Sequence, residues 1–112
     1  MKETDRIIKN LADKVRNLDE YKEYRRMTDK LKENQELYRK VCEYRRKLYV
    51  FQNRQDEVNT YEADALLRAR ESLGENTDVD RYLKAELALC RKLQQFVNGI
   101  IREIDFELGF EL

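Results

Sequence analysis

Apolar residues recur at steps of three and four along almost the whole chain, and no segment shows the alternation of apolar and polar residues that is typical of a strand. The positions between them are filled mostly by good helix formers, and the chain contains no proline. This pattern predicts an all-α protein. We expect an antiparallel bundle or hairpin of about four to five helices, with long amphipathic central and C-terminal helices.

The N-terminal third is predicted to form two short amphipathic helices. Thr4 or Asp5 is suited to cap the first helix, and Asp19 is suited to cap the second. The apolar stripe of the first helix is Ile7, Ile8, Leu11, Val15 and Leu18. The inward positions of the second helix are Tyr21, Tyr24, Met27 or Thr28, and Leu31. A break follows at Glu33 and Asn34.

Asn34 is a good cap for a third helix, whose stripe has the four-three spacing of a coiled-coil seam. That stripe is Leu37, Val41, Tyr44, Leu48 and Phe51. The polar stretch 52–60 is compatible with a kink, a loop or a continuous exposed helix. Helical pattern resumes at Tyr61 and stops near Gly74, which is predicted to be a left-handed C-terminal cap.

Thr77 and Asp80 resemble a capping box and open the last helix. Its predicted inner face is Val79, Leu83, Glu86 or Leu87, Cys90, Leu93, Val97, Ile100, Ile104 and Leu108. Gly99 interrupts this helix, which suggests a close approach of another helix. A weak repeat at an offset of 42 aligns Leu31, Glu33, Asn34 and Arg39 with Leu73, Glu75, Asn76 and Arg81. Duplication and shared capping chemistry explain this repeat equally well.

The net charge of zero conceals a division along the chain. Residues 21–50 carry ten basic and five acidic side chains, whereas residues 51–80 carry three basic and eight acidic ones. If residues 34–73 form one mostly helical segment, its basic N-terminal end opposes the helix dipole. An antiparallel neighbour from a second copy or a related chain would compensate. The division therefore predicts a dimer or a larger assembly.

The composition excludes most catalytic chemistry. The absence of histidine removes the usual nucleophile systems and several metal motifs, and the glycines are too isolated for a phosphate loop. Cys42 and Cys90 form no metal-binding pattern, and a buried apolar role is the simplest interpretation. The longest uncharged run, Leu93 to Ile101, is far shorter than the about 20 residues of a membrane span. We expect a single cytoplasmic domain over residues 1–112, without cofactor, metal or enzymatic activity.

A nucleic-acid interpretation rests on one short motif. Glu23-Tyr24-Arg25-Arg26 recurs as Glu43-Tyr44-Arg45-Arg46, and Tyr with Arg can supply stacking and phosphate contacts. Each Tyr is expected to face the core while its Arg pair points to water, and interspersed acids weaken the case. A small RNA-binding accessory protein is therefore the alternative hypothesis. Glu86 is interpreted as a salt-bridge partner or a polar specificity element at an interface.

Three passages resemble the YlbF/YmcA family of small bacterial regulators. They are Asn34-Gln35-Glu36-Leu37 leading to Phe51-Gln52-Asn53, then Glu75-Asn76-Thr77-Asp78-Val79, then Tyr82-Leu83-Lys84-Ala85-Glu86 through Gln94-Gln95 to Ile104-Asp105-Phe106-Glu107. The resemblance implies an all-helical cytoplasmic protein that forms dimers or hetero-oligomers with related small helical proteins. It also implies a role in a complex that influences ribonuclease Y-dependent RNA processing and, through it, competence, biofilm formation and sporulation.

Two departures from the family pattern matter. Gln35 and Thr77 stand where relatives often have proline, which leaves softer helix starts. Relatives that bind iron–sulfur clusters carry clustered cysteines, whereas four thiolates here would require Cys42 and Cys90 from two copies. The hypothesis from the sequence is thus a non-enzymatic adaptor. Its expected interface residues are Tyr44, Arg45, Arg46, Leu48, Phe51, Leu83, Glu86, Leu93, Val97 and Ile100.

Overall fold

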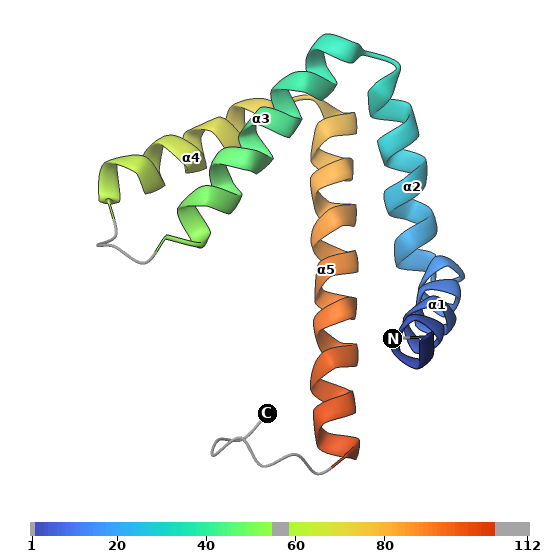
Figure 1. The fold of residues 1–112 in the computed structure, drawn as a ribbon. Helices are drawn as coiled ribbons and strands as arrows, with labels where there is room; N and C mark the ends of the chain where they lie inside the picture. Colours follow the sequence, from blue (N-terminus) through green and yellow to red (C-terminus); the bar gives the residue numbers. More distant parts are fainter. Residues whose placement is uncertain (1, 55–58, 105–112) are drawn as a thin grey trace. The chain divides into compact units, whose positions relative to one another are not determined.

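The computed structural model describes residues 2–54 and 59–104, and within these ranges the chain forms five α-helices and no strand. The helices are α1 (Lys2–Arg16), α2 (Asp19–Lys32), α3 (Gln35–Gln52), α4 (Thr60–Leu73) and α5 (Thr77–Glu103) (Figure 1). The predicted all-α class is confirmed, as is the long last helix.

The chain divides into two compact units, which are treated one at a time below. One unit combines Met1–Arg25 with Lys84–Leu112, and the other is Arg26–Leu83. Helices α2 and α5 each contribute residues to both units. That residues 1–112 form a single domain stays a prediction.

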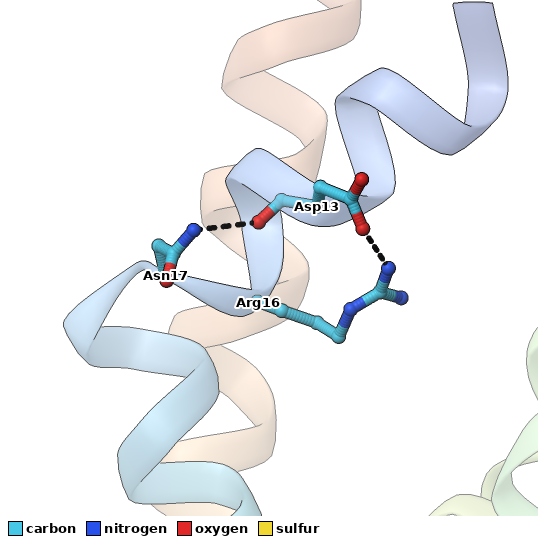
Figure 2. A network of polar contacts seen from close by, with 3 residues as sticks. All are labelled: Asp13, Arg16 and Asn17. Carbon is cyan, nitrogen blue, oxygen red and sulfur yellow. Dashed lines mark hydrogen bonds and ion pairs between the residues drawn. The ribbon is translucent and has the colours of Figure 1, made fainter. Parts of the chain in front are cut away.

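In the first unit, α1 ends in a tight turn that leads directly into α2. The Asp13 carboxylate pairs with Arg16, and the Asn17 side chain donates a 3.0 Å hydrogen bond to the Asp13 carbonyl oxygen (Figure 2). The predicted caps are wrong by a few residues, because α1 already begins at Lys2 and Asp19 lies inside the first turn of α2. At that position Asp19 favours the helix through its dipole.

The core of the second unit is formed by α2, α3 and the first turns of α5. Its buried side chains are Met27, Thr28, Leu31, Val41, Val79, Tyr82 and Leu83. The inward positions predicted at the end of α2 are therefore confirmed. Helix α4 contributes no buried side chain, so it lies against α3 without closing a second core.

Asparagine caps begin both long helices. The Asn34 side chain accepts a 3.1 Å hydrogen bond from the Leu37 amide, and the Asn76 side chain accepts 2.9 and 3.2 Å bonds from the Asp78 and Val79 amides. These bonds satisfy amides that have no partner inside the helix. The Asn34 cap is confirmed, but the capping box at Thr77 is wrong, because the cap is the preceding residue.

The segment that follows the cap at Asn34 is two antiparallel helices and not one long helix. Helix α3 ends at Gln52, where the Asn53 amide and side chain both donate to the Tyr49 carbonyl oxygen. Helix α4 starts after a new cap at Asn59, which accepts from the Glu62 amide, and it returns alongside α3 (Figure 1). An ion pair between Arg54 and Glu62 joins the two helices near their connection. The antiparallel neighbour of the basic helix α3 is therefore in the same chain.

Gly74 connects α4 to α5 in a right-handed conformation, with φ −71° and ψ −7°, so the predicted left-handed cap is wrong. The reason for glycine is space. A Cβ at this position would collide with Nη1 of Arg70 and lie 3.0 Å from the Arg70 carbonyl oxygen. The Arg70 side chain needs this space because its Nη2 forms a 2.9 Å ion pair with Asp80 at the start of α5.

Gly74→Ala is expected to lower the free energy of unfolding by about 1 kcal/mol, since the methyl group displaces Arg70 from its half-buried carboxylate partner. In an Arg70→Ala background the same substitution should cost clearly less, because the guanidinium is gone and only the close approach to the Arg70 carbonyl oxygen remains. Urea denaturation of the four proteins in this double-mutant cycle measures the coupling. Equal costs in both backgrounds would show that backbone conformation, and not Arg70, requires the glycine.

Candidate interaction surfaces

The clearest unpartnered surface lies on α5, in the first unit. The predicted inner face of this helix follows the four-three spacing of a coiled-coil seam from Val79 onward. Its first residues, Val79 and Leu83, are buried. Farther along the same stripe, Leu93, Val97 and Ile100 are 40%, 49% and 47% exposed, and Ile104 is more exposed still. We call Leu93, Val97 and Ile100, together with Ile104 just past the end of the helix, the α5 seam.

The expectation that the whole stripe faces inward is therefore wrong for its C-terminal part, the α5 seam. Phe96 beside it is also exposed. Nothing in the described chain lies within 4 Å of a Cβ built on Gly99, so the close helix approach predicted there is not found within the chain. Leu108 and the passage 105–107 fall outside the described residues.

Helix α1 also has exposed apolar residues. The apolar residues of its predicted stripe lie on one side of the helix, yet none of the side chains of α1 is buried. Ile7, Ile8 and Leu11 are all among the exposed large apolar residues. The first unit therefore leaves much of its apolar surface open to water. Contiguous exposed apolar patches mark interaction sites, whereas single exposed apolar residues are common on any surface.

A second surface is a groove of about 680 Å³ between α3 and α4, in the other unit. Its apolar lining comes from both helices and includes Tyr44, Val50, Phe51, Leu66 and Leu73. Its cationic lining is Lys40, Arg46, Lys47 and Arg54, and its carboxylates are Glu43 and Glu62. We call this feature the α3–α4 groove. It brings together three of the predicted interface residues, Tyr44, Arg46 and Phe51.

The repeated Tyr-Arg-Arg motif is split by the fold. Arg45 is half-buried, with its guanidinium carbon 5.8 Å from the centre of the buried Tyr82 ring. Arg46 is exposed and lines the α3–α4 groove. The expectation that both arginines point to water is therefore wrong for Arg45, which is part of the packing around the core.

The remaining predicted residues have different surroundings. Leu83 is buried in the second unit, whereas Leu48 and Glu86 are half-buried. Cys42 is half-buried and Cys90 is exposed, so the expectation that both are buried is not met. Within residues 2–54 and 59–104, no three side chains that bind metals come together. The same ranges contain no helix of the length and hydropathy needed to cross a bilayer.

The sequence pattern did not predict the α3–α4 groove. Lys47 and Val50 lie outside the predicted seam of α3, whereas Ala65, Leu66 and Ala69 belong to the apolar pattern expected after Tyr61. Nothing in the sequence pairs α3 with α4. The single available signal was the polar stretch after Gln52, which is compatible with the reversal of direction that the structure shows.

The protein is small and helical and has two open apolar surfaces, the α5 seam and the α3–α4 groove. The family described as control of competence regulator ComK, YlbF/YmcA, matches residues 6–105. No curated protein and no solved structure matches the chain significantly. Because the match covers nearly the whole sequence, the chain belongs to the YlbF/YmcA family of regulatory proteins.

Proposed function

We propose that this protein is a non-enzymatic adaptor that regulates through protein–protein contacts, either as a homodimer or with related small helical proteins. The family's description supports regulation of competence. By extension of the family resemblance, the regulated step is RNA processing that depends on ribonuclease Y. The chain's contribution is to assemble, and the α5 seam is the surface that it uses.

The exposure of the α5 seam is the observation that carries this proposal. A helix that is apolar at four-three spacing over several turns is suited to pack against another helix by knobs-into-holes contacts. The upstream part of the stripe has its partners in this chain, whereas the α5 seam remains open to water. A second copy of α5, or its counterpart in a related chain, offers the same spacing and would cover it.

Charge does not support the assembly in the way that the sequence suggested. The basic helix α3 lies against α4 of its own chain, so the division of charge is at least partly compensated within one molecule. The proposed assembly is therefore driven by apolar burial and not by the pairing of basic with acidic segments. Such an assembly should persist at high salt, where exposed charge pairs are screened.

Sedimentation velocity at protein concentrations of about 1 μM and above tests the proposal directly. We expect a dimer or larger species that is unchanged between low salt and roughly 1 M salt. Affinity purification from the native cell should recover related helical proteins or the ribonuclease complex. A monomer under all conditions that also recovers RNA alone would contradict the adaptor and favour the RNA-binding alternative.

A further inference from the structure

The α3–α4 groove has the form of a site for an elongated apolar segment. Along α3 it extends from Lys40 to Phe51, with Arg54 just past the end of the helix, and along α4 from Glu62 to Leu73. At 1.5 Å per residue each span is about 16 Å long, enough for roughly three turns of a bound helix. Val50, a lining residue, is 56% exposed. An amphipathic helix in an apolar groove is a common mode of peptide recognition.

The charges along the groove define what can occupy it. Four cations face two carboxylates, and both carboxylates are already engaged: Glu62 pairs with Arg54, and Glu43 lies 3.6 Å from Arg39. Lys40 is 3.9 Å from Glu36. Arg46 and Lys47 form no ion pair with any residue that the structure describes. The groove thus presents uncompensated positive charge beside an apolar floor.

We propose that the α3–α4 groove binds an acidic amphipathic helix of a partner protein, with apolar side chains on the floor and carboxylates at Arg46 and Lys47. This inference rests on the proposed adaptor function and specifies the chemistry of the segment that the adaptor captures. Nucleic acid fits the groove less well, because Glu43 and Glu62 would face phosphates and much of the floor is aliphatic.

A fluorescence polarisation titration tests the groove with a defined probe. The probe is a labelled peptide of about 14 residues with Leu and Phe at steps of three and four and Glu at most other positions. The intact chain should bind it at low salt. R46E/K47E should raise the Kd about tenfold, by converting attraction to repulsion at two exposed positions, and Val50→Asn should raise it several-fold.

Matched controls separate the groove from net charge. R68E/R81E changes the net charge by the same amount at exposed positions of α4 and α5 that do not line the groove. It should alter the Kd by less than about twofold. Circular dichroism checks that every variant is folded, and peptide-induced NMR shifts should gather on α3 and α4.

Three results would overturn the inference. The first is a loss of affinity in R68E/R81E as large as that in R46E/K47E. The second is binding of a scrambled peptide of the same composition with the same Kd as the probe. The third is displacement of the probe by single-stranded RNA at a lower concentration than the unlabelled peptide needs. The last result would assign the groove to nucleic acid. Failure of the peptide to bind a chain that still assembles would reject the groove and leave the adaptor proposal standing, because assembly is measured separately by sedimentation.

Discussion

Val97→Lys and Ile100→Lys together are expected to convert the assembled protein to monomers without unfolding it. Both side chains are about half exposed in the single chain, so lysine at these positions stays hydrated in the monomer. In an assembly through the α5 seam each substitution removes an apolar contact of about 1 kcal/mol, since only the exposed half of the side chain is newly buried, and places a charge at the centre of the interface. The Kd of the dimer should rise at least about 100-fold.

Sedimentation velocity and thermal melting, recorded on the same samples, check this result. The matched control is Ala88→Lys with Gln95→Lys, which adds the same charge at exposed positions on the opposite side of α5. The control should remain assembled. Assembly that survives V97K/I100K as well as it survives the control would remove the α5 seam from the interface.

Tyr82→Ala is expected to cause the largest loss of stability in the second unit. Tyr82 is 1% exposed and among the largest fully buried side chains of the described chain. Removal of an aromatic ring from a well-packed core costs about 3–5 kcal/mol, through lost apolar burial and the cavity that remains. That is a large part of the 5–15 kcal/mol typical of a folded domain. Chemical denaturation followed by circular dichroism measures the change.

Tyr82→Phe is the matched control, since it keeps the ring under Arg45 and should cost much less than the alanine substitution. Arg45→Met keeps most of the side-chain volume and removes the charge over the ring, which should cost roughly 0.5–2 kcal/mol. Comparable losses for the alanine and phenylalanine variants would show that the hydroxyl group, and not the packed ring, carries the contribution of Tyr82.

Charge reversal of Arg45 and Arg46 as a pair is consequently a poor probe of an interface. The two residues are neighbours in sequence, but Arg45 contacts the core and Arg46 lines the α3–α4 groove. A doubly reversed variant would lose stability and surface charge at once. Arg46 and Lys47 are the better pair, because both are exposed.

Several features of the fold were predictable from local chemistry alone. The all-α class follows from the spacing of apolar residues, and the Asn34 cap follows from its short polar side chain before a helical stripe. The burial of Met27, Thr28 and Leu31 at one face of α2 also followed from their spacing. Each of these properties depends on residues within a few positions of one another.

The features that were missed depend on contacts between distant residues. Neither glycine nor proline marks the end of α3, so its end at Gln52 was one of three open interpretations. Asn76 and Thr77 are adjacent residues that can both cap a helix, and only the geometry shows which one does. The role of Gly74 requires the Arg70–Asp80 pair, which joins α4 to α5. The same residue types, Leu, Ile and Val, occupy the buried start of α5 and its exposed continuation, so the sequence does not distinguish the two.

The α5 seam also affects the abundance of this protein in the cell. A chain that holds several large apolar side chains in water is a better target for aggregation and for proteolysis than one in which they are covered. Copies made in excess of their partner would be the first to be lost. The seam would then tie the abundance of the regulator to that of whatever covers it, so that matched synthesis becomes a condition for function.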